Sequence, residues 1–362
     1  MVECLVFSRC DIGDLAVRVL TRAAMTGTAP SSLVGDSAPL ADAIAAVEPL
    51  PLPLEALPTV GWTEVLAVHP LMKGLLPFPL LIALAVPIWW VFRKWWQEMD
   101  RESALDRARR VSVGEADHRP AVCLMLIGAI LTFHEYYGGR SFYEAVLRDE
   151  LKALEQAGLA WLKVSKYDVL YGYVWWSMSR VVGYVVVPIV TWKLLFKHDN
   201  LLDYGLRLKG TWKHAWIYGG LMALVGPVVF IVAKQPDFGS YYPFYKFSSR
   251  SWFDLLAWEA MYFAQFFALE FFFRGWMIGA LRASMGSAAI FAMSLPYCMI
   301  HYGKPYLEAH GAIIAGVVLG TLSMRTRSIY GGFFLHIGVA ALMDFLSLYK
   351  RGALPTVFWA PG

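Results

Sequence analysis

Two residues of opposite charge lie four positions apart in the stretch LEFFFRGW, residues 269–276, inside a long apolar run. Glu270 and Arg274 would occupy neighbouring turns of a helix, in the order that favours an ion pair. A charge at the centre of a bilayer costs from about 3 to more than about 10 kcal/mol, so ionisable residues in such runs point to function. A structural ion pair, in which each charge offsets the burial of the other, is the alternative.

Two histidines lie in later apolar runs, His301 near the end of one and His336 in the last. A glutamate beside a histidine can bind and deprotonate water, and a second histidine can donate to the oxyanion formed when water attacks a carbonyl. Glu270 with both histidines is also a ligand set for zinc that leaves one position open for water. The pattern predicts a hydrolytic site with either no cofactor or a divalent metal. Taken alone, each histidine is equally a hydrogen-bonded packing residue.

Two further acids are secondary candidates. Glu308 lies with Lys304 in the turn KPYLE between two apolar runs. A carboxylate near the start of a helix suits the helix dipole, and the functional alternative is substrate gating or support of His301. Asp344 follows His336 by eight residues, which is about 12 Å along a helix.

The composition indicates a membrane protein. The 362 residues are 58% hydrophobic and 15% aromatic, with a net charge of only +4, and the mean hydropathy is +0.49. These values are too apolar for a soluble domain, and nucleic acid is not an indicated partner. The four cysteines form no CxxC pair, so neither a disulfide framework nor a cysteine metal site is expected.

A membrane-crossing helix needs roughly 20 apolar residues, which predicts an all-α, polytopic integral membrane protein with about eight transmembrane helices. Residues 139–166 alternate charged and apolar residues at helical spacing, which is typical of an interfacial amphipathic helix. The candidate spans lie near residues 71–92, 120–138, 168–196, 212–233, 252–281, 286–303, 308–324 and 327–348.

The chain divides into four predicted parts. We expect a weakly ordered N-terminal arm over 1–66, with Met25 as an alternative translation start. Residues 67–166 would hold two spans and the amphipathic helix, 167–350 the core with the polar groups, and 351–362 a tail. Lys and Arg counts place the basic loops after the first and third spans in the cytoplasm, and both termini outside.

The polar motifs, in this order on successive apolar runs, resemble the CPBP intramembrane proteases. This CAAX protease and bacteriocin-processing family includes the type II CAAX prenyl endopeptidases. Its motifs are Glu-Glu-x-x-x-Arg with Phe before and Gly after the Arg, then Phe-x-x-x-His, then His followed four positions later by Asn or Asp. The resemblance covers residues 168–348. The matching residues are Glu270, Phe273, Arg274, Gly275, Tyr297, His301 and His336.

Two positions depart from the family pattern. Leu269 stands where the family has its first glutamate, which leaves Glu270 as the carboxylate of the motif. Ala340 stands four residues beyond His336, where the family has Asn or Asp. Because both histidines are kept at membrane depth, we expect a site rebuilt around Glu270 rather than a lost one.

The resemblance implies an intramembrane endopeptidase of a bacterial-type cell membrane, acting near a membrane-associated, C-terminal segment of a substrate protein. Its partners would be this membrane-anchored protein or peptide and the lipid bilayer. Glu270 would activate water or bind a metal, with His301 as its partner on the water. His336 would stabilise the oxyanion or be a further ligand, and Arg274 would orient Glu270. The alternative is a non-enzymatic transporter or an interaction or immunity protein that uses the same groups for binding.

Overall fold

The computed structural model describes residues 74–362 except 235–237, 303, 305, 361 and 362, and without the side chains of 209, 210 and 306–308. The predicted N-terminal arm and Met25 lie outside this part. The described residues form helices and turns, with a single isolated β-bridge between Leu206 and Ser328 and no named strand. The predicted all-α class is therefore confirmed.

Five helices in the described part are long and apolar enough to cross a membrane, or six if a pair bent by 51° counts as one span. The predicted polytopic architecture is confirmed, but the count of eight is not. The bent pair is α6 (Arg119–Tyr136) with α7 to α8 (Arg140–Gln156). The five are α5 (Pro77–Ser112), α9 to α10 (Val164–Leu195), α12 (Ala215–Val232), α14 to α15 (Trp252–Met285) and α18 (Tyr330–Lys350).

The predicted span at 286–303 contains a shorter helix, α16 (Ala288–Met299), of 12 residues. At 1.5 Å per residue it is about 18 Å long, whereas the hydrocarbon core of a bilayer is about 30 Å thick. Pro296 lies in its last turns and Ile300 ends it. The next helix, α17 (Tyr306–Thr326), packs along α16. Helices α16 and α17 therefore pack side by side.

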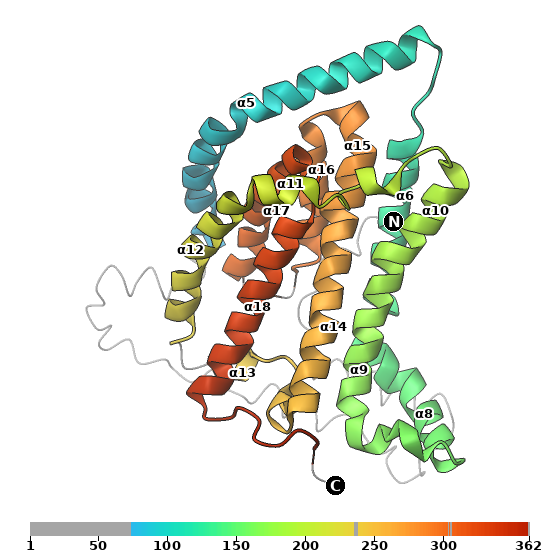
Figure 1. Ribbon diagram of the computed structural model, residues 1–362, viewed down its shortest axis with the longest axis vertical. Helices are drawn as coiled ribbons and strands as arrows, with labels where there is room; N and C mark the ends of the chain where they lie inside the picture. The colour runs from blue at the N-terminus through green and yellow to red at the C-terminus, as the bar shows by residue number, and fades with distance from the viewer. Residues whose placement is uncertain (1–73, 235–237, 303, 305, 361–362) are drawn as a thin grey trace, which may run out of the picture. The chain divides into compact units, whose positions relative to one another are not determined.

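Helix α5 continues well beyond its predicted span. The basic residues 93–112, which we expected to form a loop, are helical, and this half of α5 lies across the ends of α15 (Ile278–Met285) and α17 (Figure 1). Ser103 Oγ donates to the Ala283 carbonyl at 2.8 Å. Arg325 of α17 pairs with Glu98 at 2.6 Å. These contacts give the polar half of the helix a surface to pack on, which the sequence pattern does not show.

Helix α14 (Trp252–Glu270) is the centre of the bundle. Both α9 (Val164–Val181) and α18 pack against it, and α12 packs on α18 (Figure 1). Ser251 begins the helix because its Oγ accepts from the Asp254 amide at 3.1 Å, which satisfies one of the free N–H groups of the first turn. The arrangement places the polar residues of α14 opposite those of α18.

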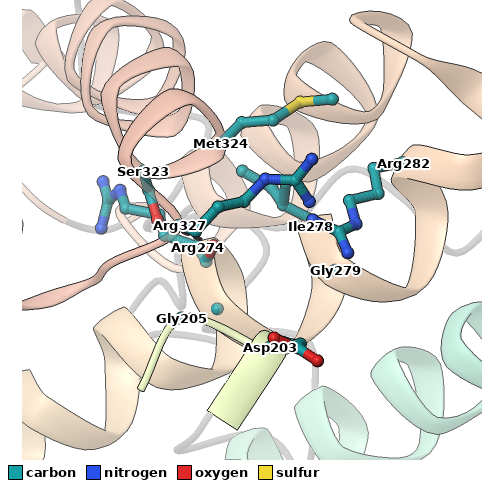
Figure 2. A pocket seen from close by; sticks show the side chains of 10 residues that line it. Asp203, Gly205, Arg274, Ile278, Gly279, Arg282, Ser323, Met324 and Arg327 are labelled. Carbon is teal, nitrogen blue, oxygen red and sulfur yellow. Dashed lines mark hydrogen bonds between the residues drawn. The ribbon is translucent and has the colours of Figure 1, made fainter. Parts of the chain in front are cut away.

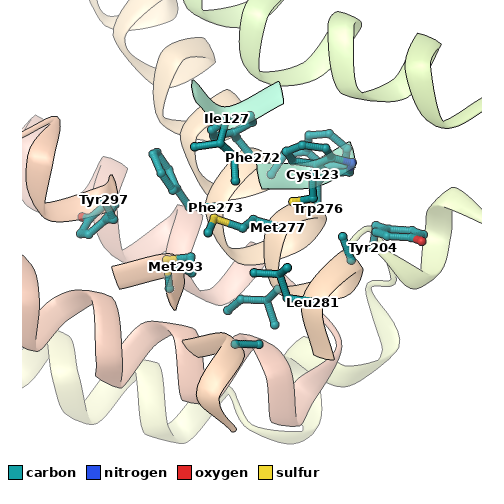
Figure 3. Close-up of a cluster of buried hydrophobic side chains, with 14 of the residues drawn as sticks. Cys123, Ile127, Tyr204, Phe272, Phe273, Trp276, Met277, Leu281, Met293 and Tyr297 are labelled. Atoms are coloured by element: carbon teal, nitrogen blue, oxygen red, sulfur yellow. The ribbon is translucent and has the colours of Figure 1, made fainter. Parts of the chain in front are cut away.

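Helix α14 continues into a wider π-helical turn, η6 (Phe271–Met277), which lies in the largest hydrophobic cluster. Phe272 stacks on Tyr184 with ring centroids 4.5 Å apart. It also stacks on Trp276 at 5.2 Å, and Figure 3 shows these two side chains in the cluster. Within a bilayer, close van der Waals packing of this kind holds helices together, because lipid is as apolar as the side chains. The aromatic cluster therefore fixes the position of η6.

A second π-helical turn, η3 (Val182–Val186), faces a buried histidine of α6. His134 Nε2 lies 2.9 Å from the Ser179 carbonyl, and its ring meets Tyr184 edge-on at 4.5 Å. A Cβ added at Gly183 would overlap the His134 imidazole. The glycine is what allows α6 to approach η3 this closely.

One ion pair fastens the start of α6 to the segment after α10 (Val187–Leu195). Arg119 Nε donates to Asp199 Oδ2 at 2.8 Å and its Nη2 donates to Oδ1 at 2.5 Å. This two-bond contact with a guanidinium lowers the pKa of Asp199 from its ordinary value.

We expect Gly183→Ala to lower the free energy of unfolding by about 1–3 kcal/mol, because the new methyl group displaces His134. Gly128→Ala on α6 is the matched control, since its added Cβ would meet nothing within 4 Å. It should be neutral or stabilise the helix by up to about 1 kcal/mol. Thermal unfolding in detergent measures both variants, and equal midpoints would contradict the packing argument.

Candidate active site

Glu270 and Arg274 form an ion pair at the junction of α14 and η6. Arg274 Nη1 donates to Glu270 Oε1, and both side chains are fully buried, with 0% of their surface exposed. The predicted spacing of four residues is therefore a contact in the structure. Removing either partner would leave an uncompensated charge in the bundle interior.

His336 approaches the same carboxylate from α18. Its Nδ1 lies 2.6 Å from Glu270 Oε1, although the direction of the ring does not meet hydrogen-bond geometry. The ring stacks on Phe266 with centroids 5.2 Å apart, and 21% of the side chain is exposed. Two helices thus bring Glu270, Arg274 and His336 together.

The second oxygen of Glu270 points at the backbone of α18. Glu270 Oε2 is buried and receives no hydrogen bond from the described residues. A Cβ added at Gly332 would lie 2.6 Å from this oxygen, so only glycine leaves space for the carboxylate there. The pair Gly331 and Gly332 in the last span was the sequence signal for this close approach, and our sequence reasoning missed it.

Tyr297 connects His301 to the ion pair. The Arg274 guanidinium lies over the Tyr297 ring, with Cζ 4.2 Å from the centroid, in a cation–π contact. His301 Nδ1 is 2.7 Å from the Tyr297 carbonyl oxygen, and the two rings pack 4.8 Å apart. Because a carbonyl oxygen only accepts, Nδ1 carries the proton, which makes Nε2 of the neutral ring an acceptor.

The described residues contain no group of three or more His, Cys, Asp or Glu placed to hold a metal ion. Glu270, His301 and His336 therefore do not form a ready ligand set in this arrangement, and we derive no step through a metal. The metal-dependent alternative stays a prediction. The side chain of Glu308 lies outside the described residues.

Asp344 belongs to a different polar cluster from His336. Trp258 Nε1 donates to Asp344 Oδ2 at 2.7 Å, and the Glu259 side chain contacts the same carboxylate. Our sequence reasoning did not single out Glu259. It precedes Glu270 by 11 residues, about three turns, so it lies on the same face of α14. The face of α14 toward α18 thus carries two carboxylates about 16 Å apart along the helix.

The family comparison agrees with the motifs. The family model described as Type II CAAX prenyl endopeptidase Rce1-like matches residues 251–342, a range that includes Glu270, Arg274, His301 and His336. This match agrees with the resemblance that the sequence motifs indicate. It spans 92 of the 362 residues, so it concerns α14 to α18 and not the helices before them. No curated protein and no solved structure matched the chain.

Gly332→Ala should displace the Glu270 carboxylate, because the new Cβ would lie 2.6 Å from Oε2. We expect a loss of about 1–3 kcal/mol in the free energy of unfolding, as for other overpacked sites. Gly338→Ala, two turns further along α18, is the matched control, since its Cβ would meet nothing closer than Met222 Cε at 3.5 Å. Thermal unfolding of both variants in detergent tests this, and equal losses would refute the contact.

Glu270→Gln and Arg274→Met should each destabilise the protein by about 3–5 kcal/mol, because each leaves one buried charge unpaired. The double variant should lose less than the sum, and a double-mutant cycle on unfolding measures the difference. Asp203 and Arg207 provide the control, an ion pair of the same spacing that is 46% and 47% exposed. Asp203→Asn should cost less than about 1 kcal/mol. Strict additivity at Glu270 and Arg274 would show that the two charges do not interact.

Proposed function

We propose, from the match of α14 to α18 to the type II CAAX prenyl endopeptidase Rce1-like family, that this chain is an intramembrane endopeptidase whose reaction centres on Glu270. The observation that carries the proposal is the fully buried carboxylate with one oxygen bound and the other without a donor. A buried charge of this kind within membrane-crossing helices is kept at a high energetic cost.

The two oxygens of Glu270 would have different tasks. Oε1 is held by Arg274 and approached by His336, which fixes the position of the carboxylate. Oε2 has its lone pairs available and can accept a proton from a water molecule. Arg274 itself is held by Glu270 and by the Tyr297 ring. The base is therefore positioned before substrate binds.

Peptide hydrolysis would use Glu270 together with His301 and His336. The water oxygen attacks the scissile carbonyl carbon while its proton passes to Glu270 or to His301 Nε2. His336 donates to the oxyanion that develops on the carbonyl oxygen. The C–N bond then breaks, and the proton held by the base passes to the leaving amine. The water is thereby divided between the new carboxyl group and the new amine.

The substrate class follows from the depth of Glu270. Its helix, Trp252–Met285, has the length and apolar composition of a membrane span, so the scissile bond must enter the bilayer. A segment beside a membrane anchor near the C-terminus of a protein meets this requirement. The anchor itself need not be a prenyl group.

The test compares membranes of cells that express wild type, Glu270→Gln or His301→Ala, by mass spectrometry of the C-terminal ends of membrane proteins. Specific C-terminal fragments should accumulate with wild type and fall by roughly 10²- to 10⁴-fold with each variant, the usual contribution of a general base. Glu135→Gln and His198→Ala change the same residue types at exposed positions. Both controls should behave as wild type.

Equal fragment profiles for wild type and Glu270→Gln, with every variant folded and equally abundant, would refute the protease proposal. The polar groups would then be assigned to binding or transport. Loss of fragments in Glu270→Gln alone would keep the glutamate as the base and remove His301 from the reaction.

A further inference from the structure

A pocket with an unusual charge balance lies at the end of the bundle that α5 covers, and it shares Arg274 with the candidate active site. It is formed by η6 and α15, the end of α17, and the segment at residues 203–205, and its volume is about 10 Å³. Figure 2 shows the side chains that line it. They include Arg282 from α15 and Arg327 from the residues just after α17.

The positive charges of the two arginines have few acidic partners at close range. The Arg282 side chain is partly buried and makes no hydrogen bond or ion pair with any residue that the structure describes. Arg327 reaches only the exposed Glu102, at 3.5 Å. The acid that lines the pocket, Asp203, is already paired with Arg207 at 2.6 Å. Arg274, which is paired with Glu270, also lines the pocket, so three guanidinium groups lie around the single acid Asp203.

The backbone at one of these arginines is also unusual. Arg327 has a φ of 56°, in the left-handed region that non-glycine residues seldom adopt. Backbone strain of this kind tends to be kept where a side chain has a functional role. Arg327 lines the same pocket as Arg282, although the two lie 45 positions apart in the sequence.

We propose that Arg282 and Arg327 bind the phosphate of a phospholipid headgroup. The guanidinium fork matches phosphate oxygens in geometry and charge. The enclosed space accepts about one water-sized group, so a single phosphoryl oxygen enters while the rest of the headgroup stays at the surface.

The depth of the pocket identifies the source of the phosphate. Arg282 lies three residues before the end of the span Trp252–Met285, and Arg327 lies three residues before the start of Tyr330–Lys350. Both arginines are therefore at the level where the apolar parts of the two spans stop and headgroups begin. The half of α5 that contains residues 93–112 crosses the same end of the bundle.

The binding test uses delipidated protein in detergent, titrated with phosphatidylglycerol and followed by native mass spectrometry. Wild type should retain one tightly bound lipid, and Arg282→Gln with Arg327→Gln should weaken its binding at least 10-fold. The matched control, Arg101→Gln with Arg109→Gln, removes the same charge from the exposed face of α5 and should bind as wild type. Equal weakening in both double variants would show general charge attraction and overturn the site.

A second arm distinguishes lipid phosphate from free phosphate. An excess of inorganic phosphate should leave the bound lipid in place. Displacement of the lipid by inorganic phosphate would assign the site to a soluble anion. If the double variant fails to accumulate, Arg327 alone is substituted. Arg327→Gln should weaken lipid binding several-fold and Arg327→Lys less, because lysine keeps the charge but not the fork. Unchanged binding in Arg327→Gln would overturn the proposal.

Discussion

The ion pair between Glu270 and Arg274 constrains the whole centre of this protein. Both side chains are completely buried, and two charges removed from water must be compensated by each other and by what surrounds them. Tyr297 supplies a π face to the guanidinium and His336 approaches the carboxylate. These partners come from α16 and α18, so the pair can exist only where three helices meet.

The π-helical turn η6 carries Arg274 of this ion pair and directly follows Glu270. A π turn interrupts the regular hydrogen-bond pattern of a helix, and such turns often occur at functional sites. Here Ser323 Oγ donates to the Arg274 carbonyl at 3.0 Å, so α17 satisfies the main chain of the turn. The aromatic side chains of η6 hold it on the other side, where Phe272 stacks on Tyr184. The charged site and the apolar core therefore depend on one segment.

The departure at Leu269 has a structural explanation. The Leu269 side chain is only 5% exposed and belongs to the main hydrophobic cluster. A carboxylate at this position would enter an apolar environment without the guanidinium that Glu270 has. Glu270 instead lies against Gly332 of α18, where a missing Cβ gives its second oxygen room. Glu270, the acid that remains in the motif, thus lies where the packing of α14 against α18 leaves room for a carboxylate.

The sequence by itself determined the all-α membrane class, the ion pair at a spacing of four residues, and the resemblance of residues 251–342 to a known family, because apolar run length and helical spacing are local properties. It could not determine that residues 93–112 continue a helix, since that depends on contacts with α15 and α17. Only the tertiary structure decided that His336 meets Glu270 while Asp344 joins Trp258 and Glu259. Which polar groups meet is set by the rotation and register of packed helices, and no local pattern in a single helix contains that information.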